Sequence, residues 1–174
     1  MTTSARISRA KRIVIKVGSS SITGANEPNL DLIVDFVAQQ TKSGKEVIVV
    51  SSGAIATAAP LIGLTVKSED LATSQALASI GQARLMGRYE RSLARHELIP
   101  GQILLTVDNL DEDQPRMDAS RALERLLEIG VVPIINENDS VATFCPWNGE
   151  FVEILPHKAS CVYKSTFGLG IFEV

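Results

Sequence analysis

Four short polar segments each follow an apolar run of the chain, and their residue types suit the binding of a polar ligand. The segments begin at Gly18, Ser51, Thr106 and Asn136. Glycine lets the backbone approach a ligand closely, hydroxyl and amide groups donate hydrogen bonds, and acidic groups can orient an amine or a metal-bound ligand. Since ligands of open parallel sheets bind beyond the carboxyl ends of the strands, these segments predict a polar active-site rim.

The segment Lys16-Val17-Gly18-Ser19-Ser20 carries the sharpest local signal. Backbone N–H groups of glycine and serine after a strand can cradle a phosphate, and Lys16 adds a compact positive charge. The segment is not a Walker A loop, because Lys16 precedes Gly18 instead of following the glycines at a helix start. The pattern is also compatible with a surface lysine followed by an ordinary turn.

Two further segments allow a functional and a structural interpretation. The run from Ser51 to Ala56, which contains Ser52 and Gly53, is either a second anion-binding turn at a helix start or a tight strand-to-helix connection. The run Asn136-Glu137-Asn138-Asp139 is either part of a polar site or a plain loop.

Strand-like and helix-like segments alternate along the chain. The expected strands, nearly continuous in β-branched residues, are 12–17, 46–50, 102–105 and 131–135. The expected helices are one capped by Asn29 and followed by Gly44, one from Asp70 to His96 interrupted by Gly81, and one from Met117 to Ile129 closed by Gly130. This alternation predicts βαβ units and a parallel α/β sheet.

Composition narrows the possible functions. The 174 residues are 45% hydrophobic and carry a net charge of −3, which predicts one packed domain and argues against a nucleic-acid partner. The uncharged stretch Val47–Val66 is as long as a membrane span, but Pro60 and several polar residues argue against one. Two cysteines without CxxC spacing and two separate histidines, His96 and His157, predict no metal site and a cytosolic protein.

The composition changes after Thr143. The last 31 residues, Phe144–Val174, hold six of the eight aromatic residues and both cysteines. One interpretation is a divergent edge element or hairpin that packs aromatic side chains on the sheet. The other is that the chain departs here from its ancestral pattern.

Taken together, the motifs resemble the glutamate 5-kinases of the amino-acid-kinase family. The matching stretches are 15–20 (IKVGSS), 50–56 (VSSGAIA), 78–82 (ASIGQ), 101–106 (GQILLT) and 132–139 (VPIINEND). The resemblance implies a parallel-sheet α/β/α sandwich of the amino-acid-kinase type. It also implies transfer of the γ-phosphoryl group of ATP, with Mg²⁺, to the side-chain carboxylate of L-glutamate in proline biosynthesis, and a possible homo-oligomer.

The resemblance also assigns roles to individual residues. Lys16 matches the lysine that neutralises phosphate and is the expected catalytic residue, and Gly18 and Ser19 match backbone donors to the transferring group. The expected glutamate-binding residues are Ser52, Gly53, Asn136 and Asp139. Transfer of a phosphoryl group to a carboxylate needs cations and hydrogen-bond donors for positioning and needs no protein nucleophile.

The resemblance covers residues 1–143, the expected glutamate and γ-phosphate part of the domain, and stops at the tail 144–174. The fold is therefore expected to be incomplete at its C-terminal side, without the nucleotide-binding half. Two alternatives stay open: a non-catalytic remnant that binds an acidic metabolite, and another carboxylate kinase of the same fold. A dinucleotide-binding oxidoreductase is disfavoured, since no G-x-G-x-x-G follows the first expected strand.

Overall fold

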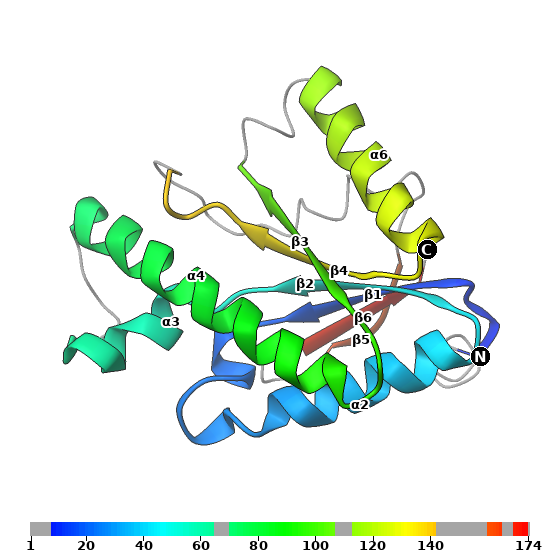
Figure 1. Ribbon diagram of the computed structural model, residues 1–174, viewed down its shortest axis with the longest axis horizontal. Helices are drawn as coiled ribbons and strands as arrows, with labels where there is room; N and C mark the ends of the chain where they lie inside the picture. The colour runs from blue at the N-terminus through cyan, green and yellow to red at the C-terminus, as the bar shows by residue number, and fades with distance from the viewer. Residues whose placement is uncertain (1–7, 65–69, 107–112, 142–159, 165–168, 174) are drawn as a thin grey trace.

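A single six-stranded sheet organises the chain (Figure 1). The computed structural model describes residues 8–64, 70–106, 113–141, 160–164 and 169–173, and for the last two ranges the backbone alone. The strand order is β3-β4-β2-β1-β6-β5. Four strands run parallel: β1 (Arg12–Val17), β2 (Glu46–Ser51), β3 (Pro100–Leu105) and β4 (Val132–Glu137). This confirms the parallel α/β sheet predicted from the sequence.

The helices lie on both faces of the sheet. They are α2 (Asn29–Lys42), α3 (Ala54–Ala58), α4 (Leu71–Ala94) and α6 (Asp113–Glu128), with short 3-10 helices η1 (Ser19–Ser21), η2 (Gly24–Asn26) and η3 (Ala59–Ile62). In Figure 1, α2 and α4 lie on one side of the sheet and α6 lies on the other. The chain therefore has the three layers of an α/β/α sandwich.

Alternation along β1 divides the apolar residues into two cores. Ile13, Ile15 and Val17 belong to the larger core, with α2 and α4, whereas Val14 belongs to the smaller core, with Leu123 of α6. All of these side chains are at most 1% exposed. Successive side chains of a strand point to opposite faces, so a strand covered on both faces needs apolar residues on both, as β1 has from Ile13 to Val17 with the exception of Lys16.

The helix ends agree with the sequence in part. The Asp70 side chain accepts a hydrogen bond from the backbone N–H of Thr73 (2.9 Å) and caps α4. Gly44 and Gly130 follow α2 and α6 with positive φ angles of 86° and 76°, as predicted for residues that end helices. The prediction that Asn29 caps α2 is wrong: Pro28 precedes the first turn, and no side chain caps it.

The helix α4 runs without a break through Gly81, so the predicted interruption there is wrong. Gly81 instead allows close packing, because a Cβ atom at this position would lie 1.8 Å from the backbone oxygen of Ala54 in α3. Helix propensity disfavours glycine by only about 1 kcal/mol, and the packing of α4 on α3 and on the sheet offsets that cost.

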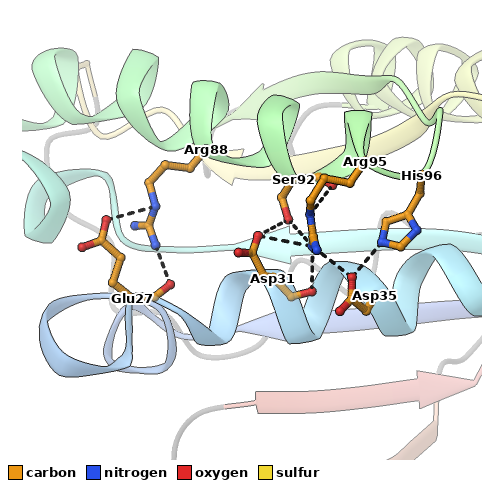
Figure 2. A network of polar contacts seen from close by, with 7 residues as sticks. All are labelled: Glu27, Asp31, Asp35, Arg88, Ser92, Arg95 and His96. Carbon is orange, nitrogen blue, oxygen red and sulfur yellow. Dashed lines mark hydrogen bonds and ion pairs between the residues drawn. The ribbon is translucent and has the colours of Figure 1, made fainter.

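Polar contacts join α4 and the two residues after it to α2 and to Glu27, which precedes α2 (Figure 2). Arg95 lies 2.9 Å from a carboxylate oxygen of Asp35, which also contacts Nε2 of His96 at 2.7 Å. Ser92 donates a hydrogen bond to Asp31. His96 therefore has a structural partner, and the described residues contain no group of three or more His, Cys, Asp or Glu side chains that could hold a metal ion.

The backbone of the C-terminal tail adds two strands to the sheet. Strand β6 (Leu169–Glu173) pairs antiparallel with β1, and β5 (Ser160–Lys164) pairs antiparallel with β6. Two strands added at the edge of the sheet are compatible with both interpretations of the tail, so the choice between them stays open. His157 and residues 144–159 lie outside the described residues.

No helix in the described part of the chain combines the length and apolar character that a membrane span requires. The uncharged stretch that begins at Val47 is divided among β2, α3 and η3, and Pro60 lies in η3.

The close contact at Gly81 predicts unequal effects of two glycine-to-alanine changes in α4. G81A should lower the free energy of unfolding by about 2 to 3 kcal/mol, because the new methyl group would overlap the Ala54 carbonyl. The matched control is G87A, whose Cβ would meet only a terminal nitrogen of Arg91 at 3.5 Å. G87A should leave stability unchanged or raise it by up to about 1 kcal/mol. Urea unfolding measures both, and equal effects would contradict the packing.

Candidate functional site

The carboxyl ends of the four parallel strands lie level with one another. Val17 of β1 is in register with Ser51 of β2, and Val50 is in register with Ile135 of β4. Leu105 of β3 is in register with Glu137 of β4. The polar segments that follow these strands therefore leave the same edge of the sheet, as the sequence predicted.

Lys16 is the second-last residue of β1 and is half-buried. It alternates with Ile15 and Val17, so its side chain lies on the α6 side of the sheet, as that of Val14 does. Gly18 and Ser19 follow directly, and the turn η1 is closed by a hydrogen bond from Ser21 N to Gly18 O of 3.0 Å. A lysine ammonium and a turn of small residues are thus held together at the end of one strand.

The segments that follow β1 and β2 touch. The backbone N–H of Ser52 donates to the carbonyl of Val17 (2.9 Å). Gly53 has a φ angle of +120°, and a Cβ atom on it would lie 3.5 Å from Cα of Ser19. Glycine is favoured here because other residues rarely adopt this backbone conformation. The structure therefore brings Gly18 and Ser19 together with Ser52 and Gly53.

Asn136 is connected to α4 through Gln82. Its side-chain amide donates to Oε1 of Gln82 (2.9 Å), and its own Oδ1 accepts from the backbone N–H of Glu137 (2.9 Å). The amide nitrogen of Gln82 is buried without a hydrogen-bond partner among the described residues. A buried amide donor without a partner is costly, so it is a feature that a bound ligand could satisfy.

The residue-by-residue reading of the sequence gave Gln82 no role, although it ends the matching stretch 78–82. The signal in the sequence that could have pointed to Gln82 was its position directly after Gly81. In the structure, Gly81 is the residue at which α4 packs on Ala54. That contact brings the next residue of the helix close to the end of β4.

Asp139 lines a small cavity with a volume of about 20 Å³, close to that of one water molecule. The other lining residues are Ala78, Gln82, Leu104, Glu137, Asn138 and Ser140. Burial and, to a smaller extent, the nearby carboxylate of Glu137 together raise the pKa of Asp139 to about 6. A cation placed here would relieve both effects, because it favours the ionised carboxylate.

Ser52 is not among the residues that line this cavity. That the expected glutamate-binding residues Ser52 and Asp139 line one pocket therefore stays a prediction, although both residues follow strands at the same edge. Of the third polar segment only Thr106 is described, and residues 107–109 lie outside the described part of the chain.

A buried hydroxyl pair supports the start of the second segment. Tyr89 of α4 is fully buried and donates to Oγ of Ser51 (2.9 Å), and Ser51 in turn donates to the carbonyl of Ser52 (3.2 Å). Burial raises the pKa of Tyr89 to about 12, so the phenol keeps its proton and remains a donor. This chain of hydrogen bonds connects the buried face of α4 to the backbone at Ser52 and holds it in place.

Comparison with known proteins identifies the lineage of this arrangement. Residues 11–149 match the model of the amino acid kinase family, which is most of the chain. The chain belongs to the amino acid kinase family. The matched range ends close to the change of composition after Thr143.

Curated relatives in this family carry the name glutamate 5-kinase. The chain is 50% identical to one from Thermobifida fusca over 145 residues, which are 81% of this chain and 37% of the relative. It is 49% identical to one from Leifsonia xyli over 79% of this chain and 51% of the relative. For Clavibacter michiganensis the identity is 50%, over 80% of this chain and 54% of the relative. The chain thus spans between about a third and a half of these amino acid kinases.

The environment of Asp139 predicts a characteristic dependence of stability on pH. The pKa is raised from 3.8 to about 6, so between these values the folded protein binds the proton more tightly than the unfolded chain does. The free energy of unfolding should therefore fall as the pH rises through this window. D139N should remove the fall and be more stable than the unchanged chain at pH 7 by about 1 kcal/mol, a value reduced for solvent screening.

Carboxyl chemical shifts and urea unfolding at pH 3 and pH 7 test this directly. E137Q is the matched variant, and it should lower the pKa of Asp139 because one source of repulsion is removed. A pKa near 4 for Asp139 in the unchanged chain would contradict the proposed environment.

Proposed function

We propose that this chain supplies the glutamate and γ-phosphate side of a glutamate 5-kinase, which transfers a phosphoryl group from ATP to L-glutamate and forms L-glutamate 5-phosphate. The observation that carries the proposal is the close approach of Gly53 to Ser19, beside the hydrogen bond from Ser52 to Val17, which brings the expected phosphate loop next to the expected substrate loop. The relatives of about 50% identity support the same reaction.

In this reaction an oxygen of the glutamate side-chain carboxylate forms a bond to the γ-phosphorus, and the bond from that phosphorus to the bridging oxygen of ADP breaks. Negative charge approaches negative charge, so catalysis depends on positioning and on positive groups and donors around the transferring phosphoryl group. Lys16 supplies a positive charge at the end of β1, and the backbone of Gly18 and Ser19 supplies donors.

The proposal assigns the other end of glutamate to the loop after β4. Asp139 would bind the α-ammonium group, which would lower the pKa of Asp139 and keep it ionised beside Glu137. Asn136 positions the side chain of Gln82, whose amide nitrogen has no partner among the described residues and suits a carboxylate oxygen of the substrate. Ser52 and Gly53 would bind the substrate from the adjacent strand.

ATP enters the proposal as a substrate, with Mg²⁺ bound to its phosphates. Mg²⁺ commonly binds through substrate phosphates and one or two carboxylates, and it would offset the charge on the transferring group. We expect the reaction to take place in the cytosol and the protein to associate with further copies of itself.

A chimera tests the proposal, since the chain spans only 37% of the Thermobifida fusca relative. Residues 11–143 of this chain would replace the corresponding part of that relative. The chimera should form acyl phosphate from glutamate and Mg-ATP, trapped as the hydroxamate. K16A should lower kcat by about a hundredfold or more, the effect of losing one group that stabilises the transition state, with little change in melting temperature.

K42A is the matched control, because Lys42 is exposed at the end of α2, and it should leave kcat unchanged. The 174-residue chain by itself should form no acyl phosphate, and turnover in the usual kinase range of roughly 1 to 100 per second would contradict that expectation. A folded K16A chimera with unchanged kcat would contradict the role of Lys16. Equal loss of activity and melting temperature would make that lysine structural.

A further inference from the structure

An open groove with a volume of about 720 Å³ lies on the α4 side of the molecule, outside the residues assigned to the kinase site. One wall is the segment from Thr23 to Glu27, another is formed by α3 and η3, and the floor is the middle of α4. The α3 wall and the floor include apolar side chains, among them Leu61 and Ile80, which are 53% and 40% exposed.

Three arginines of α4 line this groove: Arg84, Arg88 and Arg91. They are spaced four and three residues apart, so they lie on one face of the helix. Gly87 lies between them, and a Cβ atom on it would come within 3.5 Å of a terminal nitrogen of Arg91. The guanidinium of Arg91 therefore lies back along the helix beside Gly87, on the face that lines the groove.

The positive charge of the groove is only partly neutralised. Arg88 donates to the backbone carbonyls of Ile22 and Glu27 (2.9 and 3.0 Å), and it lies 3.5 Å from the Glu27 carboxylate (Figure 2). Glu27 is the one acidic residue among the described residues that line the groove. Within the described part of the chain, neither Arg84 nor Arg91 has an ion pair.

The next arginine, Arg95, directly follows α4 and is different. Arg95 lies within 3.3 Å of Asp31 and 2.9 Å of Asp35, as Figure 2 shows. The charge of Arg95 is therefore balanced by acidic residues of α2, whereas the described residues that line the groove include three arginines and one acidic residue, Glu27.

We propose that this groove binds a small polyvalent anion, an oligophosphate or a polycarboxylate. Guanidinium groups bind both kinds of oxyanion through paired N–H donors, and two of them one or two helical turns apart fit a ligand with more than one anionic group. Arg84 and Arg91 contact the ligand, and Arg88 is already fixed in place by its backbone bonds. The groove admits a small molecule and not only a single ion.

Two side chains that line the groove hydrogen-bond to the backbone of the candidate site. Thr23 donates to the carbonyl of Ser19 (2.9 Å), and Thr57 donates to the carbonyl of Gly53 (2.7 Å). Both threonines line the groove. The groove is therefore adjacent to the place where the polar segments after β1 and β2 meet, and two threonines connect them.

Calorimetric titration of the 174-residue chain with pyrophosphate and, separately, with citrate tests the proposal, at low ionic strength and without Mg²⁺. At least one probe should bind, and R84Q/R91Q should weaken it at least about tenfold, as expected for the loss of charge-assisted hydrogen bonds. Binding of pyrophosphate alone would indicate a phosphate ligand, and binding of citrate alone a carboxylate ligand. Both results support the site.

Two controls separate this site from general charge and from the kinase site. R121Q/R125Q removes the same charge from α6, on the other face of the sheet, and should change the dissociation constant less than about twofold. K16A should leave binding in the groove unchanged. If R84Q/R91Q fails to fold, R91Q alone serves, because Arg91 is exposed and unpaired among the described residues.

The proposal is overturned if neither probe binds, or if K16A abolishes binding and R84Q/R91Q does not. It is also overturned if light scattering shows that the chain self-associates through this face, with association lost in R84Q/R91Q and no binding of either anion. The groove would then be an interface between copies of the chain.

Discussion

The backbone of α4 approaches that of α3 at Gly81, where no side chain separates the helix from the carbonyl of Ala54. Much of the candidate site depends on this contact. It sets the depth at which α4 lies against the sheet, so that Tyr89 reaches Ser51 and Gln82 reaches Asn136. One helix thereby connects the loop after β2 with the loop after β4, which are far apart in the sequence.

The second constraint is electrostatic, because the two ends of the candidate site carry opposite charges. Lys16 follows the apolar part of β1, whereas Glu137 and Asp139 are held together at the end of β4. The raised pKa of Asp139 reflects first its burial and then the nearby carboxylate of Glu137. An amino acid with an ammonium group at one end and an anion at the other complements this arrangement.

The strands could be predicted closely because a strand that is covered on both faces of the sheet requires a nearly continuous run of apolar residues, as in β1 and β2. Strand β4 was predicted to end at Ile135 but continues to Glu137. Hydropathy could not reveal this extension, because Asn136 and Glu137 are polar yet only 3% and 5% exposed. The hydrogen bond from Asn136 to Gln82 compensates for part of that burial, and a partner 54 residues away is not visible in a local pattern.

The interruption of α4 at Gly81 was wrongly predicted for a similar reason, because a local rule about glycine was overridden by a tertiary contact. The resemblance to known kinases predicted which residues form the site, but it did not reveal the hydrogen bonds that support them. Tyr89 is an example, since a buried tyrosine in a helix is equally compatible with an ordinary core position.

The most direct test of the account is the site of glutamate binding on this chain. Amide chemical shifts of the ¹⁵N-labelled protein would be followed while L-glutamate is added, with D-glutamate as the control. The account predicts that L-glutamate shifts the amides of Ser52, Gly53, Asn136 and Asp139 and the side-chain amide of Gln82, while those of α6 stay unchanged. Shifts confined to other parts of the chain, or equal shifts with D-glutamate, would contradict it.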